Sequence, residues 1–140
     1  MKALSVIQPY ATLLAIGAKS IETRSWKTLY RGLLAVHASQ TIKREYRECC
    51  SEEPFRSVLL DAGYASWQDL PRGVVLATAR LIDCIPTEVL VAQSDVYLPG
   101  NEQAFGFYDP HRYGWLLENV EALPQPVQAV GRLGLWEWNP

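Results

Sequence analysis

The feature that most restricts the possible folds is a long apolar run, Gly73–Ile85, rich in β-branched residues. Such a run is typical of a strand at the centre of a sheet, and Pro86 should end it. The segments that follow alternate apolar and polar residues, and tight turns separate them: 113–120, 127–130 and 135–138. A doubly wound parallel sheet needs a helix between most strands, so this order favours a mostly antiparallel sheet.

The first half of the chain supplies shorter elements. Lys2–Ile7 and Leu33–Ala38 are predicted strands, and Tyr10–Ile16, which is apolar almost all round, is a predicted buried helix. Helical spacing predicts two further helices, one after Thr41 and one after Ser51, as cover for the sheet. We therefore expect an α+β fold, a small and mostly antiparallel β-barrel with flanking helices.

Two segments of the second half are expected to be irregular. Pro124 and Pro126 should interrupt the strand in which they lie. Residues 92–111 are rich in Pro, Gly, Asn and Asp and also contain aromatic side chains. This connection is a candidate mobile flap, or its aromatic side chains pin it to the core. His111 and Arg112, at its exit, are placed to reach a ligand.

Length and cysteine content limit the class of protein. A chain of 140 residues can bury one substantial core, so we expect a single domain over residues 1–140. The three cysteines, Cys49, Cys50 and Cys84, form no Cys-x-x-Cys pair, which argues against a disulfide framework or a zinc site. No apolar run approaches the roughly 20 residues of a membrane span. We expect a cytoplasmic protein without metal or cofactor.

The charge balance limits the possible nucleic-acid roles. The chain has 13 basic and 15 acidic residues, a net charge of −2. A protein that coats nucleic acid through phosphate contacts alone is usually basic. Any nucleic-acid role should therefore depend on a local patch or pocket.

Charged and aromatic side chains gather in residues 17–32, directly after the predicted buried helix. Gly17 should end that helix, and alternation in a short following strand would bring several of these side chains to one face. An aromatic ring for stacking beside charges for phosphate or base edges suits a nucleic acid. The candidate binding residues here are Lys19, Glu22, Arg24, Trp26 and Arg31, of which Lys19 and Glu22 are also candidate catalytic residues.

Plainer interpretations exist for the same residues. The segment is also consistent with a solvated turn, whose surface ion pairs are each worth about 0–1 kcal/mol. Lys19 faces the negative end of the preceding helix, a favourable position that needs no function. His37 is more typical of a hydrogen-bonded core histidine than of a catalytic base, because no neighbour in sequence offers it a partner.

Several phrases of the sequence resemble the activating signal cointegrator homology (ASCH) domain. The core of the resemblance is Gly-x-Lys-x-x-Glu-x-Arg, formed here by Gly17, Lys19, Glu22 and Arg24. The matching segments are Leu4–Leu14, Gly17–Trp26, Tyr30–Gly32, His37–Ser39, Gly73–Cys84, Tyr113–Asn119 and Gly131–Trp136. They run nearly from end to end of the chain.

The resemblance implies a fold like the pseudouridine synthase and archaeosine transglycosylase (PUA) domain, with a ligand cleft beside the first helix. Family members are generally taken to bind RNA or other nucleic acid, and some occur in transcriptional coactivators. By this likeness Lys19, Glu22 and Arg24 line the cleft, and Gln8, Tyr10 and Trp26 help to shape it. RNA is thus the expected partner, with a protein partner as an alternative.

One branch of short family members consists of N4-acetylcytidine amidohydrolases with catalytic Lys, Thr and Glu. Their Lys corresponds to Lys19, but the position of their Thr is Glu22 here, and Glu88, Glu102 and Glu118 all remain candidates for their Glu. Three hypotheses follow: an RNA-binding protein; a hydrolase of RNA or of a nucleoside that uses Lys19; and a protein-interaction module built on the aromatic connection.

Overall fold

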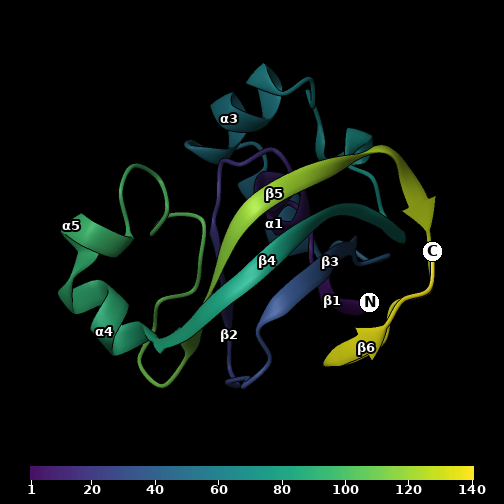
Figure 1. The fold of residues 1–140 in the computed structure, drawn as a ribbon. Coiled ribbons are helices and arrows are strands. Elements are labelled where there is room, and N and C mark those ends of the chain that lie inside the picture. Colours follow the sequence, from purple (N-terminus) through teal and green to yellow (C-terminus); the bar gives the residue numbers. More distant parts are fainter.

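The structure, a computed structural model that describes all 140 residues, contains a six-stranded sheet curled into an open half-barrel (Figure 1). The strands are β1 (Lys2–Val6), β2 (Ile21–Arg24), β3 (Gly32–Ala38), β4 (Val74–Pro86), β5 (Tyr113–Gln128) and β6 (Leu135–Glu137). Their order across the sheet is β2-β5-β4-β3-β1-β6. Only the pairing of β1 with β3 is parallel, and the other pairings are antiparallel. The expected, mostly antiparallel barrel is therefore confirmed, although its sheet is mixed and not purely antiparallel.

The long apolar run forms the central strand, as predicted. β4 pairs with β3 on one side and with β5 on the other. Val75, Ala77 and Leu81 on this strand are fully buried. Pro86 ends the strand, and the next residue begins a helix.

Strand β5 continues through the two prolines, contrary to the predicted break at Pro124 and Pro126. The reason lies in its register with β4, because Val75 pairs with Val127 while Ala77 pairs with Ala122. The prolines fall inside this irregularity, where the ladder needs no N–H from them. A bulge therefore allows a proline in a paired strand.

The helices are short and lie around the sheet (Figure 1). They are α1 (Tyr10–Ala15), α2 (Arg44–Cys49), α3 (Phe55–Asp61), α4 (Thr87–Ala92) and α5 (Ser94–Tyr97), with a 3₁₀ turn, η1, at Trp67–Asp69. Helix α1 is packed against the sheet and buried through Leu14, and Gly17 ends its turn with φ +79°, as predicted. None of the helices is both long and apolar enough to span a bilayer.

The connection between β4 and β5 is held against the core by its aromatic side chains. Phe105 is fully buried in the main hydrophobic cluster, with its ring centroid 4.9 Å from that of Phe55. The Tyr108 hydroxyl is also buried. The sequence left two expectations for this segment, a mobile flap or a connection pinned to the core by its aromatic side chains. The structure agrees with the second.

Candidate ligand-binding site

A cavity of about 310 Å³ opens where α1, β2 and the β4–β5 connection meet. The residues that line it are Ile7, Tyr10, Lys19, Glu22, Thr23, Arg24, Ser25, Trp26, Tyr46, Phe107 and Arg112. Five of the seven candidate binding residues are among them: Tyr10, Lys19, Glu22, Arg24 and Trp26. The structure therefore brings most of the candidate set into one place.

Gln8 and Arg31 lie outside this cavity. Gln8 is fully buried, and its carboxamide accepts from the backbone N–H of Thr12 at 2.9 Å and donates to the carbonyl of Pro71 at 2.8 Å. It therefore fixes the entry into α1. Arg31 is turned to the surface, where it donates to two nearby carbonyls and lies 3.5 Å from Asp83.

Lys19 is the most deeply placed charge in the cavity wall. Its side chain is 0% exposed, and Nζ donates a hydrogen bond to the carbonyl of Phe105. Nζ also lies 3.8 Å from Oε1 of Glu22 and 5.6 Å from the ring centroid of Tyr10. Burial lowers the pKa of Lys19, although the nearby carboxylates of Glu22 and Glu102 act in the opposite direction.

Glu22 and Arg24 form an ion pair at the mouth of the cavity. Arg24 donates from Nη1 to Oε2 of Glu22 at 3.2 Å and to the carbonyl of Ser5 at 3.2 Å. The carboxylate is 8% exposed and the guanidinium 24%. Alternation along β2 places both on the cavity side, as predicted. The remaining Glu22 oxygen faces Lys19 and accepts no hydrogen bond from the protein.

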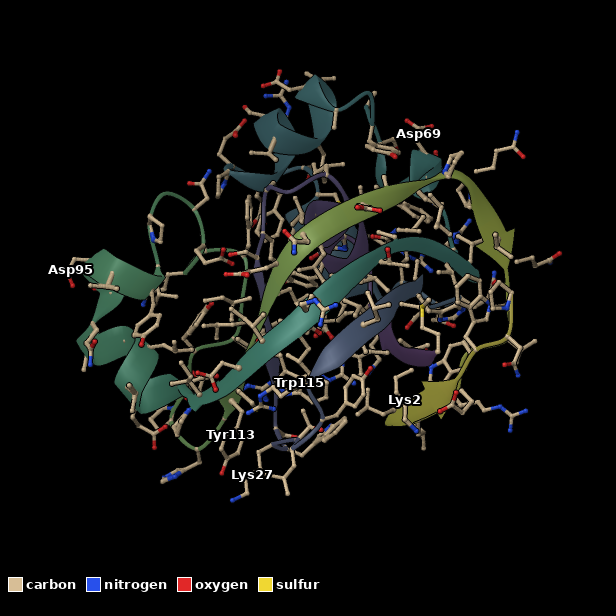
Figure 2. All side chains as sticks on the ribbon, viewed as in Figure 1. Lys2, Lys27, Asp69, Asp95, Tyr113 and Trp115 are labelled. Carbon is tan, nitrogen blue, oxygen red and sulfur yellow. The ribbon has the colours of Figure 1, made fainter.

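Aromatic rings make up much of the remaining wall. The ring centroid of Tyr10 lies 5.9 Å from that of Tyr46 and 5.4 Å from that of Phe107. Burial raises the pKa of both tyrosines, so their hydroxyls stay neutral at physiological pH. Trp26 packs edge-on against Trp115, which lies inside the molecule (Figure 2).

The β4–β5 connection adds lining residues that lie outside the Gly-x-Lys-x-x-Glu-x-Arg motif. The backbone N–H of Phe107 donates to Oγ1 of Thr23 at 2.9 Å, and Arg112 donates from Nε to the Phe107 carbonyl at 3.1 Å. Arg112 thus reaches the cavity, as expected for the exit of this connection, whereas His111 is 92% exposed beside Glu88. Tyr46 on α2 and Phe107 were not singled out as site residues, because both are distant in sequence from the motif.

The cavity is locally cationic in a chain of net charge −2. Three cationic side chains line it, from Lys19, Arg24 and Arg112, against the single carboxylate of Glu22. A nucleic-acid role would need a local cationic patch in a chain of this net charge, and the cavity is such a patch. Its cations are ringed by aromatic side chains instead of being spread over a flat surface.

Glu102 is the only one of the three carboxylates considered for a catalytic role that approaches Lys19. It is buried, and its oxygens accept from the backbone N–H of Ser20 at 2.9 Å, from its hydroxyl at 2.7 Å, and from the N–H of Ile21 at 3.3 Å. It does not line the cavity. Its position indicates a clamp that joins the β4–β5 connection to the start of β2.

Replacing this clamp by an amide should destabilise the protein. In Glu102→Gln one acceptor becomes a donor that faces N–H donors, so we expect a loss of about 1–3 kcal/mol of unfolding free energy in urea denaturation. Glu52→Gln, on an exposed carboxylate that accepts no hydrogen bond within the protein, is the matched control and should change stability by less than about 0.5 kcal/mol. Equal effects of the two substitutions would contradict the clamp.

Comparison with known proteins gives one family. The model of the ASCH domain matches residues 4–124. Over 83 residues, 59% of this chain, the sequence is 40% identical to activating signal cointegrator 1 of Homo sapiens, and the same values hold for that of Mus musculus. The match spans only 14% of those relatives.

Solved structures agree on the fold. Crystal structures of ASCH from Zymomonas mobilis and of a point mutant of it both align with a TM-score of 0.53 over 91% of this chain. The alignments cover 72% of the first and 74% of the mutant, at 15% and 14% identity. At this identity the likeness shows the fold alone, which is the PUA-like half-barrel.

Proposed function

Because the chain belongs to the ASCH domain family, we propose that it is a nucleic-acid-binding protein whose ligand is single-stranded RNA or a modified base. The observation that supports this proposal is the convergence of cationic and aromatic side chains on one cavity. Stacking surfaces beside phosphate-binding cations are the usual components of single-strand recognition. Lys19 and Arg24 supply the charge, and Tyr10 and Trp26 the ring faces.

The depths of the charges suggest separate roles for them. Lys19 is fully buried, so it can meet only a group that enters the cavity, such as a base carbonyl or ring nitrogen. The Lys19 ammonium has three N–H donors and uses one on Phe105, while Glu22 keeps an oxygen that can accept from an exocyclic amine. Arg24 lies nearer the surface, where a phosphate remains solvated.

Binding of single-stranded RNA should fall with salt and should require an unpaired base. For single strands the affinity changes with a slope of about −0.7 per phosphate contact in a log–log plot against salt, so contacts from Arg24 and Arg112 alone contribute about −1.4. A fluorescence anisotropy titration with a labelled single strand measures this slope, and the matched RNA duplex is the control. Binding that ignores salt, or that is equally tight to the duplex, would oppose the proposal.

The proposal also predicts a loss of affinity on the alkaline side. Lys19 has a lowered pKa, while burial raises the pKa of Tyr10 and Tyr46, so Lys19 should be the first of these groups to lose its proton as the pH rises. Binding of oligoadenylate, whose base has no proton to lose in this range, should weaken below the ordinary lysine pKa of 10.5. Unchanged affinity up to that pH would mean that the ligand does not use the Lys19 ammonium.

A second candidate function is hydrolysis of RNA or of a nucleoside amide. The observation that favours it is a buried amine of lowered pKa beside a carboxylate, a pairing that suits acid–base chemistry. Incubation of the protein with single-stranded RNA and with N4-acetylcytidine, followed by chromatography of the products, tests it. Product from the wild type but not from Lys19→Met, purified alike, would make the protein an enzyme, and binding without product would make it a reader.

A further inference from the structure

A second and larger cavity, of about 730 Å³, has Ser5 of β1 among its lining residues. It is lined by the ends of strands β3, β4 and β5 and by residues 129–133, which lead to β6. It shares no lining residue with the candidate site. Nothing in the proposal above makes use of it.

Its floor is a fixed hydrogen-bond network centred on His37, which is 2% exposed. Nε2 of His37 lies 2.8 Å from the carbonyl of Ala129, which can only accept, so Nε2 holds the proton. Nδ1 therefore accepts from the Ser5 hydroxyl at 3.0 Å, and the indole N–H of Trp136 donates to the same hydroxyl at 3.1 Å. His37 is thus a satisfied core histidine, as predicted, and its role is to hold the cavity in shape.

The close approach of Gly131 keeps the loop on this floor. A Cβ at this position would lie 2.6 Å from both the Ser5 hydroxyl and Cε1 of His37, so only glycine fits. The loop and the network therefore position each other. The cavity is preformed and does not have to be created by a ligand.

The polar side chains around the cavity are free to meet a ligand. Those of Ser39, Gln40, Gln128 and Arg132 line it and take part in no hydrogen bond or ion pair within the protein. No carboxylate lines the cavity, so an anionic ligand meets a cation and no opposing charge. Carboxamides can donate to and accept from base edges, and a guanidinium suits phosphate.

Ser5 connects this cavity to the candidate site. Its side chain lines the second cavity, while its carbonyl accepts from Nη1 of Arg24, which lines the first. A phosphate on Arg24 would therefore stand between the two cavities.

We propose that the second cavity is a subsite for a neighbouring nucleotide of the same single strand, with Arg132 on its phosphate and Gln40 and Gln128 at its base. The inference rests on the proposed RNA binding at the candidate site. The occupant is a nucleotide because the cavity combines an unpaired cation, two carboxamides and hydroxyls with room for a group larger than a base.

Affinity measurements with ligands of different length test the subsite. A single-stranded RNA of about ten nucleotides should bind the wild type more tightly than any nucleoside 5′-monophosphate. Arg132→Ala should weaken the longer ligand about tenfold, reduce the salt slope by about 0.7, and leave monophosphate affinity unchanged. Arg56→Ala, an exposed arginine on α3, is the control and should leave both affinities unchanged.

The indole N–H signals of the tryptophans, followed by NMR, locate each ligand. The Trp136 signal, hydrogen-bonded to Ser5, should shift with the longer RNA alone, and the Trp115 signal, bonded to the Trp26 carbonyl, with both ligands. Shifts at Trp115 alone, or an Arg132→Ala variant with wild-type affinity, would overturn the subsite while the candidate site stands. If no ligand shifts Trp115 either, both proposals fail.

Discussion

Replacement of Lys19 by methionine should weaken RNA binding and leave the protein folded. A charged hydrogen bond contributes about 1.5–3 kcal/mol, so its loss should weaken affinity by about 10- to 100-fold. The variant loses a fully buried ammonium whose desolvation is unfavourable, but it also leaves the buried Phe105 carbonyl without its donor, so we expect a net loss of at most about 3 kcal/mol of unfolding free energy. Glu22 keeps Arg24 as a partner in the variant.

The pH dependence of the unfolding free energy gives a second way to test the role of the buried Lys19 ammonium. The folded-state pKa of Lys19 is lowered, so between that pKa and the ordinary 10.5 the unfolded chain binds more protons than the folded one. The wild type should therefore gain stability as pH rises through this interval, and the methionine variant should lack that gain. Urea denaturation at several pH values measures the difference.

The matched control is Lys27→Met, at an exposed lysine that projects from the edge of the molecule (Figure 2). It should change stability by less than about 0.5 kcal/mol and affinity by less than about threefold. If Lys19→Met bound RNA as tightly as the wild type, the Lys19 ammonium would take no part in RNA binding. If it failed to fold, Lys19 would be a structural residue.

Replacement of Phe105 by alanine should have the largest effect on stability. The side chain is fully buried in the main cluster, its ring packs against that of Phe55, and its backbone carbonyl holds Lys19. Truncation of a buried Phe costs about 3–5 kcal/mol, a large part of the stability of an ordinary domain. Thermal and urea denaturation measure the loss.

Val96→Ala, in the same β4–β5 connection but 67% exposed, is the control and should cost less than about 0.5 kcal/mol. A small effect of Phe105→Ala would mean that the connection is a loosely attached flap. If partly folded Phe105→Ala protein bound RNA with wild-type affinity, the binding site would not depend on the packing of the β4–β5 connection.

The sequence predicted the parts of the structure that depend on local patterns. The apolar run of β4, the buried helix α1 and the stop at Gly17 follow from residue type and spacing alone. The same holds for Lys19 and Glu22, which stand three residues apart and meet at the start of β2. Local spacing is enough when the chain between two residues is short.

The remainder depends on contacts between distant segments. Tyr46 and Phe107 reach the cavity from α2 and from the β4–β5 connection, and no periodicity indicates which face of the sheet those segments cover. The prolines of β5 lie in a bulge set by the register with β4, which sequence alone does not reveal. Gln8 matches the family phrase, but its carboxamide closes a turn instead of facing a ligand.

Ultraviolet cross-linking of single-stranded RNA to the wild type, with the modified peptides mapped by mass spectrometry, tests the central claim most directly. The account predicts adducts on the aromatic wall, at Tyr10, Trp26, Tyr46 or Phe107, which disappear when unlabelled RNA competes. Adducts confined to other aromatic residues, such as Trp67 in η1, would contradict it and place RNA binding elsewhere on the protein.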